Sequence, residues 1–393
     1  MKGSEKVAEQ KAKSRAERKT EKNAQTDKLY EEAMAEYADN AAESSDAPKE
    51  KSKLGKRIGI VLFILLNAAV IWWTASSEFS GKELPPVNFT FTSVLFLLGG
   101  LLCLVLVLGC ETLKYIIMMR HLGEKVSVRH ALSTAVLGKY YDCVTPSGAG
   151  GQPFQIYHLH SNGYSSGASS AMPLSAFVTM QFGFVILCII AFIFGNGAIN
   201  ATGQTGIKII AYVGAIAYTV VPVMIIISGV APKIAMRIVA FFVRIGAFLH
   251  IVKRPNHVIM KAVRSLNNYS ESIKHLTEDR RLLIKLLLLS IVFQIAMCSM
   301  PFFAVRTFGG ELGYFEALFM CIYIQAAITL IPTPGNAGAA EGSFYMVFSS
   351  LGTAGTFWAM LVWRFLCYYS FVTIGVLTYI YNAFIKLRDK RRA

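Results

Sequence analysis

Long apolar stretches recur along the chain from residue 58 onward and are separated by short polar segments. A helix of about 20 mostly apolar residues is long enough to cross the hydrocarbon core of a bilayer. The stretches that reach this length predict six membrane-spanning helices, at residues 58–76, 91–119, 172–194, 207–229, 282–303 and 357–384. The uncharged segment 195–206 is expected to be a loop between two of them. The pattern therefore predicts an all-α integral membrane protein.

Two further apolar regions are interrupted by proline and small residues, at residues 145–153 (TPSGAGGQP) and 332–341 (PTPGNAGAAE). Four positions of the two motifs are identical when the Thr-Pro pairs are aligned: Thr145/Thr333, Pro146/Pro334, Ala149/Ala337 and Gly150/Gly338. Such residues break a helix, and the freed backbone groups are tolerated at membrane depth only when they are buried in protein or line a cavity. A matched pair of broken segments in the two halves of a membrane protein indicates a transport site.

Basic residues indicate how the chain is oriented. Lys and Arg cluster before the first span and after the last one, so the positive-inside rule predicts that both termini are cytoplasmic. This requires the broken region 314–350 to be a re-entrant hairpin from the outside, whereas the region 131–171 enters from the cytoplasm. The predicted fold is thus six full transmembrane helices plus two re-entrant helical hairpins in an inverted repeat. Repeat 1 covers about 58–200 and repeat 2 about 207–385, and the hairpin tips are expected to meet near the midplane.

The polar segments define the remaining organisation. Residues 1–52 alternate charged and small residues and predict a disordered, charged cytoplasmic tail, followed by a transmembrane domain at 53–393. The basic stretch 230–281 is interleaved with phenylalanines and predicts a cytoplasmic interfacial segment on the anionic inner leaflet. Nucleic acid is the weaker partner for this stretch because it is tethered between two spans, so we expect no nucleic-acid binding.

Composition supports a membrane protein and excludes a large soluble enzyme. The 393 residues are 54% hydrophobic with a net charge of +15, and half of the 24 acidic residues precede Arg57. The seven cysteines lie mostly in apolar stretches without a CxxC pair, which indicates free thiols and no zinc site. His158 and His160 are two residues apart, on opposing sides of a helix, without a third ligand nearby. No metal and no cofactor is therefore expected.

Ionisable residues at membrane depth are functional candidates that need a partner. Glu341 lies at the start of the half-helix that leaves the second break, where the positive helix end favours a carboxylate, and Arg364 in the last span is its natural partner. Lys139 and Asp142 are three residues apart on one helix face just before the first break. The alternative interpretation is that both pairs only lock the hairpins in place. Four more ionisable residues lie in or near the spans: Glu111, Lys114, Arg306 and Glu316.

Glycines at the two breaks are candidates for a lipid-phosphate site. Bare backbone amides at half-helix tips bind anions, although small residues serve tight helix packing equally well. Neither motif is a Walker loop or a dinucleotide fingerprint. The glycines concerned are Gly148, Gly150, Gly151, Gly335 and Gly338. The full candidate set for lipid binding is Lys139, Asp142, Gly150, Gly151, Gln152, Pro334, Gly335, Gly338, Glu341, Arg364 and Tyr368, and no catalytic residue is predicted.

The two motifs, together with Trp363, Arg364 and Tyr368, resemble the lysylphosphatidylglycerol synthase transmembrane region family. This is the flippase half of the multiple peptide resistance factor, which also occurs alone as a flippase-like membrane protein. The resemblance extends from about Lys53 to the C-terminus. Gln155 stands where an arginine is expected, and Asn336 where the family often has a second glycine. The resemblance implies transport of a phospholipid such as lysyl-phosphatidylglycerol across the cell membrane, with a link to antibiotic resistance.

The leading hypothesis is a phospholipid flippase that moves a polar-headgroup lipid between leaflets. One alternative is a phosphatidylglycerol lysyltransferase, as the family name suggests, but full-length relatives place that activity in a soluble acyltransferase domain that uses charged transfer RNA. Because the chain ends at Ala393 directly after the last span, we expect that domain to be absent and the chain not to be an enzyme. The other alternative is a non-transporting membrane scaffold. Partners besides the phospholipid are left open between a second copy of the chain and a separate synthase.

Overall fold

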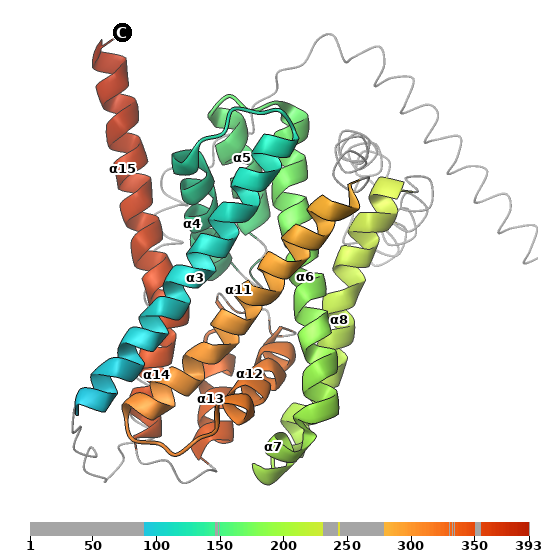
Figure 1. Cartoon of the computed structure of the whole chain (residues 1–393), viewed down its shortest axis with the longest axis vertical. Helices are drawn as coiled ribbons and strands as arrows, with labels where there is room; N and C mark the ends of the chain where they lie inside the picture. Colours follow the sequence, from blue (N-terminus) through green and yellow to red (C-terminus); the bar gives the residue numbers. More distant parts are fainter. Residues whose placement is uncertain are drawn as a thin grey trace, which may run out of the picture. The chain divides into compact units, whose positions relative to one another are not determined.

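The computed structural model describes residues 90–145, 148, 150–230, 243, 279–329, 331, 333, 335–349 and 355–392. The tail 1–52, the span predicted at 58–76 and nearly all of the basic stretch 230–281 lie outside the described residues. The chain divides into two units, and almost all described residues belong to the unit formed by Lys51–Pro222 and Asp279–Ala393. All regular elements among the described residues are helices, which confirms the all-α class (Figure 1).

Four helices among the described residues are long and apolar enough to cross a membrane. Three are single α-helices and the fourth is composite: α3 (Phe91–His121), α6 (Ser166–Phe194), α11 (Arg280–Thr307), and the continuous run of α14 (Thr356–Arg364), η1 (Phe365–Tyr369) and α15 (Ser370–Arg392). α8 (Thr205–Val230) contains a shorter apolar stretch at Thr205–Val220, and only its residues up to Pro222 belong to this unit. The four long helices agree with the spans predicted at 91–119, 172–194, 282–303 and 357–384.

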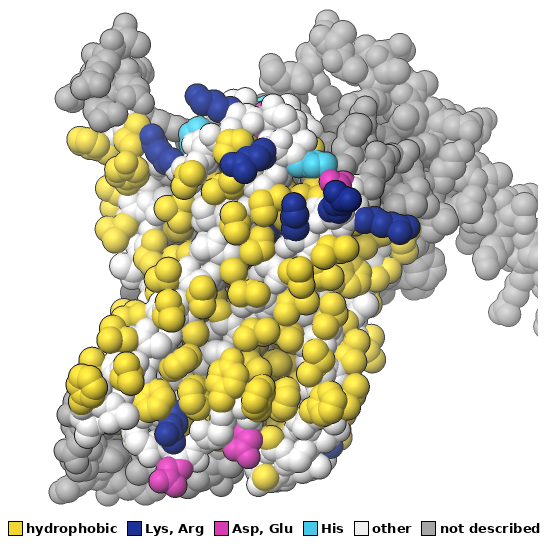
Figure 2. Space-filling model, viewed as in Figure 1, with side chains coloured by type: hydrophobic (Ala, Val, Ile, Leu, Met, Phe, Trp, Pro, Cys, Tyr) yellow, Lys and Arg dark blue, Asp and Glu magenta, His cyan; other side chains and the backbone are white. Residues whose placement is uncertain are grey.

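The outer surface of these helices is apolar. Figure 2 shows hydrophobic side chains across the middle of one face, with most of its Lys and Arg side chains towards one end. Exposed apolar residues of α3 and α11 include Leu95, Leu98, Leu102, Val105, Leu288 and Val292. A continuous exposed apolar surface of this kind marks contact with lipid. The protein is therefore a membrane protein.

Two boundaries differ from the sequence prediction. α6 begins at Ser166, six residues before the predicted start at Met172, because the Ser165 hydroxyl accepts a hydrogen bond from the Ala168 amide and caps the helix. The segment 195–206, predicted to be a loop, contains the short helix α7 (Asn196–Ala201). Ile199 in α7 is buried in the core, and Asn196 Oδ1 accepts hydrogen bonds from the hydroxyls of Tyr212 and Tyr323, so the short helix is held against the unit.

Each broken motif is flanked by two helices that pack against one another. α4 (Val128–Val144) and α5 (Gly151–Ser161) form the first hairpin, and α12 (Tyr314–Ile328) and α13 (Ala339–Ser349) form the second. The first hairpin follows α3 and the second follows α11. Since α3 and α11 pack together and run in opposite directions, the hairpins lie at opposite ends of the unit (Figure 1).

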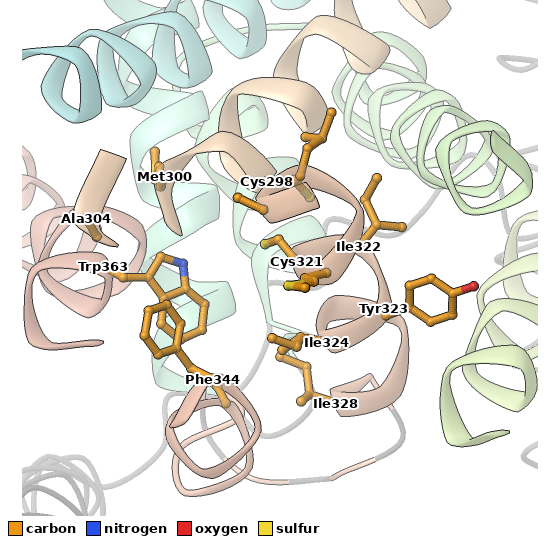
Figure 3. Close-up of a cluster of buried hydrophobic side chains, with 14 of the residues drawn as sticks. Cys298, Met300, Ala304, Cys321, Ile322, Tyr323, Ile324, Ile328, Phe344 and Trp363 are labelled. Atoms are coloured by element: carbon orange, nitrogen blue, oxygen red, sulfur yellow. The ribbon is translucent and has the colours of Figure 1, made fainter. Parts of the chain in front are cut away.

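The core is centred on α11 and the second hairpin. Cys298 on α11 lies near Cys321 on α12, and Phe344 of α13 stacks on Trp363 of α14 with ring centroids 4.7 Å apart (Figure 3). Aromatic contacts of this size add about 0.5–1.5 kcal/mol beyond burial of their area. The second hairpin is thereby fixed to the α14 segment that carries Arg364.

The last span is not a continuous α-helix. Directly after Arg364 the backbone forms one π-helical turn, η1, before the α-helical pattern resumes in α15. π-turns are rare and occur frequently at functional sites. Here the turn carries Tyr368, which is buried between the two hairpins as described below.

Candidate functional site

The second hairpin tip is fixed by the pair that the sequence predicted, Glu341 with Arg364. Glu341 lies in the first turn of α13, and its Oε1 accepts a hydrogen bond from Arg364 Nε at 2.6 Å. Its Oε2 accepts another from the Gly338 amide at 2.7 Å. Arg364 Nη1 and Nη2 donate to the carbonyl oxygens of Gly335 (3.3 Å) and Asn336 (3.5 Å). The pair therefore also binds the broken backbone, and both side chains are buried.

Left-handed backbone at residues 335–338 turns the carbonyl groups towards Arg364. Gly335 has φ +56° and Asn336 has φ +54°, a region that glycine adopts freely and asparagine tolerates. Gly335 is also required for space, because a Cβ there would overlap the ring of Tyr368. Asn336 thus fits the backbone geometry of the tip. Pro334, also a predicted site residue, lies outside the described residues.

The first hairpin tip is closed by side chains of α4. Asp142 Oδ1 accepts a hydrogen bond from the Gly151 amide at 3.0 Å, and Thr145 Oγ1 accepts one from the Gly150 amide at 2.9 Å. A Cβ at residue 151 would overlap the Asp142 carboxylate, so this cap requires glycine. The expectation of bare amides is wrong at Gly150 and Gly151, and at Gly338 in the other tip, because the chain supplies its own acceptors.

Lys139 and Asp142 form the second predicted pair, in a looser arrangement. Lys139 Nζ lies 3.7 Å from Asp142 Oδ2, and the two side chains keep 16% and 22% of their surface exposed. Lys139 Nζ also lies 4.7 Å from the centre of the Phe293 ring and 3.8 Å from Met180 Sδ, which are weak partners for an ammonium group. The Lys139 ammonium therefore retains capacity to bind an anion.

Tyr368 connects the two tips. Its hydroxyl donates a hydrogen bond to the carbonyl oxygen of Cys143 at 3.4 Å, in the last turn of α4. Its ring packs against Gly335 and lies 5.1 Å from the Arg364 guanidinium carbon. The two broken segments, whose aligned threonines Thr145 and Thr333 are 188 residues apart in sequence, are therefore brought together on one aromatic side chain.

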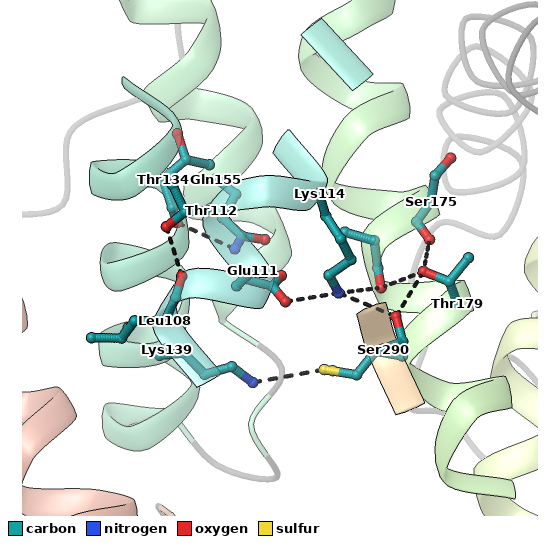
Figure 4. Close-up of polar contacts among 12 residues, drawn as sticks. Leu108, Glu111, Thr112, Lys114, Thr134, Lys139, Gln155, Ser175, Thr179 and Ser290 are labelled. Atoms are coloured by element: carbon teal, nitrogen blue, oxygen red, sulfur yellow. Dashed lines mark hydrogen bonds and ion pairs between the residues drawn. The ribbon is translucent and has the colours of Figure 1, made fainter. Parts of the chain in front are cut away.

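Sequence reasoning noted Glu111 and Lys114 but assigned them no role. They form an ion pair in α3 at 2.7 Å, and Lys114 is completely buried. Lys114 Nζ also donates to the carbonyl oxygen of Ala176 on α6 and to Ser290 Oγ on α11, both at 3.4 Å (Figure 4). The i, i+3 spacing in α3 was a signal for the pair. It gives no information about partners on other helices.

The remaining predicted residues have more ordinary surroundings. Gln152 is half-buried in the first turn of α5. Gln155, where an arginine was expected, is buried and donates to the carbonyl oxygen of Thr134, so it packs within the first hairpin. His158 shares a hydrogen bond of 2.8 Å with Ser133. Among the described residues, no three His, Cys, Asp or Glu side chains gather in the way a metal ion needs.

Comparison with known proteins places this arrangement in context. The family model described as lysylphosphatidylglycerol synthase TM region matches residues 58–375 of the chain. A curated protein from Archaeoglobus fulgidus, named UPF0104 membrane protein, is 22% identical over 355 residues, covering 83% of this chain and 96% of that protein. No solved structure matches the chain significantly.

Proposed function

Because the chain belongs to the lysylphosphatidylglycerol synthase TM region family, we propose that it is a flippase that moves a polar-headgroup phospholipid between the leaflets of the cell membrane. The observation that carries the proposal is the meeting of two helix–break–helix hairpins at Tyr368, one of them bearing a partly exposed ion pair. Lysyl-phosphatidylglycerol is one lipid that the family name suggests.

The proposed topology has six full spans and two re-entrant hairpins in an inverted repeat, with both termini cytoplasmic. Its support is the repeated order of elements: α3, first hairpin, α6, and then α11, second hairpin, α14 to α15. The second set runs opposite to the first in Figure 1. The cytoplasmic end is the one where α3 ends and α11 begins, because Arg120, Arg280 and Arg281 lie there.

The first hairpin tip is the proposed headgroup site. A phosphate group is an anion of the kind that binds the Lys139 ammonium, and a headgroup amine suits the Asp142 carboxylate. The pair is separated by 3.7 Å and is partly exposed, so a lipid displaces a weak contact there rather than a tight one. The apolar outer surfaces of α3 and α11 accommodate acyl chains while the headgroup passes the break.

The experiment measures lipid translocation in proteoliposomes that contain the full chain and a headgroup-labelled fluorescent lipid. Wild type is compared with Lys139→Gln and with the matched control Lys208→Gln, whose ammonium donates a solvent-exposed hydrogen bond to Asn200. A charge-assisted hydrogen bond contributes about 1.5–3 kcal/mol. We therefore expect Lys139→Gln to slow translocation about tenfold or more, and Lys208→Gln to leave it unchanged.

Two results contradict the proposal. One is wild-type protein that moves anionic, zwitterionic and cationic lipids no faster than empty vesicles do. The other is a Lys139→Gln variant that matches wild type for every lipid that wild type moves, which removes the headgroup site from the first hairpin.

A further inference from the structure

The two ion pairs of the first half form one electrically balanced group. Lys114 and Lys139 both face the ring of Phe293 on α11, with their Nζ atoms 5.7 and 4.7 Å from its centre. Their carboxylate partners are Glu111, 2.7 Å from Lys114 Nζ, and Asp142, 3.7 Å from Lys139 Nζ. Two ammonium groups and two carboxylates sum to zero charge, which is the condition that a low-dielectric interior favours.

A buried hydroxyl beside this group has no hydrogen-bond partner. Tyr115 is completely buried, and its hydroxyl is one of few side-chain polar atoms in the described residues that are both buried and unpaired. It lies four residues after Glu111 on the same face of α3. An unpaired buried hydroxyl is unfavourable by about 1–3 kcal/mol. It therefore marks a place where a hydrogen-bonding partner is expected in another state.

Binding of a lipid phosphate changes the charge balance of the group. When Lys139 turns to the phosphate, Asp142 keeps its hydrogen bond from the Gly151 amide but loses its cation. A largely buried carboxyl group without a nearby cation favours its protonated form. One proton from water then restores the net charge to zero.

The other neighbours of Asp142 do not supply a replacement cation. On α3, Lys114 is held by Glu111, Ala176 and Ser290. On α14, Arg364 is held by Glu341 and by two carbonyl groups of the second tip. From α5 comes the Gly151 amide already mentioned, and from α11 the uncharged Phe293 ring next to Lys139.

We infer that the first hairpin couples an anionic phospholipid to a proton: binding of the lipid phosphate at Lys139 is accompanied by proton uptake at Asp142. This inference rests on the proposed function and adds the co-transported ion. It also distinguishes lipid classes. A zwitterionic lipid supplies an amine to Asp142 and a phosphate to Lys139, so the protein takes up no proton when it binds. An anionic lipid such as phosphatidylglycerol supplies only the phosphate, so the protein takes up one proton.

The test measures protons taken up per lipid bound. Full-length protein in detergent and weak buffer is mixed with short-chain phosphatidylglycerol or phosphatidylethanolamine, while a pH-indicator dye reports protons and a radiolabel reports bound lipid. We expect about one proton per bound phosphatidylglycerol and none per bound phosphatidylethanolamine. Asp142→Asn should abolish the uptake. Asp279→Asn, a matched change at an exposed carboxyl that caps α11, should retain it.

Each remaining outcome has a clear consequence. Equal proton uptake for the two lipids, or no uptake with phosphatidylglycerol bound, overturns the coupling while leaving the flippase proposal intact. Failure of the wild type to bind either lipid overturns both. The comparison of the two lipids uses wild-type protein alone, so it decides the question even if Asp142→Asn does not fold.

Discussion

The two hairpin tips contain the same kinds of group, a carboxylate, a cation and a glycine amide, but they hold them differently. At the second tip Glu341 and Arg364 are 2.6 Å apart and buried. At the first tip Lys139 and Asp142 are 3.7 Å apart and partly exposed. The tight pair fixes the backbone of its hairpin, whereas the loose pair is the one that we propose receives a lipid headgroup.

The difference has a physical origin in the cations and in their places in the chain. The planar guanidinium of Arg364 bonds a carboxylate and two carbonyl groups at once, and it joins α14 to α13. The Lys139 ammonium is a point charge on the same helix as Asp142. Loss of the Glu341–Arg364 pair therefore separates two helices, whereas loss of the Lys139–Asp142 pair changes the charge within one helix.

The largest expected effect is that of Arg364→Leu. It leaves Glu341 buried without its cation and frees the carbonyl groups of Gly335 and Asn336. Removal of one partner from a buried pair destabilises a protein by about 3–5 kcal/mol. Unfolding in detergent should show this loss as a lower midpoint temperature. The double variant Glu341→Gln with Arg364→Gln should recover part of the loss. A midpoint equal to that of the wild type would mean that the Glu341–Arg364 pair does not fix its hairpin.

A smaller effect is expected for Gly335→Ala, with Gly338→Ala as the matched control. Both residues have positive φ, so alanine is strained at each by about 1 kcal/mol. A Cβ at Gly335 additionally overlaps the Tyr368 ring, whereas one at Gly338 meets nothing within 4 Å. Overpacking adds about 1–3 kcal/mol. The midpoint temperature should therefore fall further for Gly335→Ala, and equal shifts would argue against close contact between the tip and Tyr368.

Sequence reasoning found both ion pairs of the tips because charges are scarce at membrane depth, so each of Glu341 and Asp142 had one obvious partner nearby. It did not find the contacts of Lys114, since Ala176 and Ser290 are 62 and 176 residues away and local spacing carries no information about them. The π-turn of η1 was also missed. Its sequence, FLCYY, has the apolar character of an ordinary span and contains neither proline nor glycine.

The prediction of unpaired amides at Gly150 and Gly151 was wrong for a related reason. Helix-tip amides bind anions only where nothing in the chain reaches them. Thr145 and Asp142 lie five and nine residues before the glycines that they cap, across a break whose geometry the sequence does not specify. The meeting of both tips at Tyr368 likewise depends on how α15 and η1 pack against α4, which is a property of the folded unit.

The smallest expected effect on stability accompanies a large effect on transport, and it separates the two tips most sharply. Lys139→Gln removes a long ion pair within one helix, a contact worth about 0.2–0.5 kcal/mol, and Asp142 then takes up a proton instead of remaining a lone charge. The midpoint temperature of unfolding in detergent should stay close to that of wild type, while translocation slows about tenfold as argued for the headgroup site. The opposite pattern, a clear loss of stability with transport retained, would assign Lys139 the same locking role as Arg364. The two hairpins would then differ in geometry without differing in purpose.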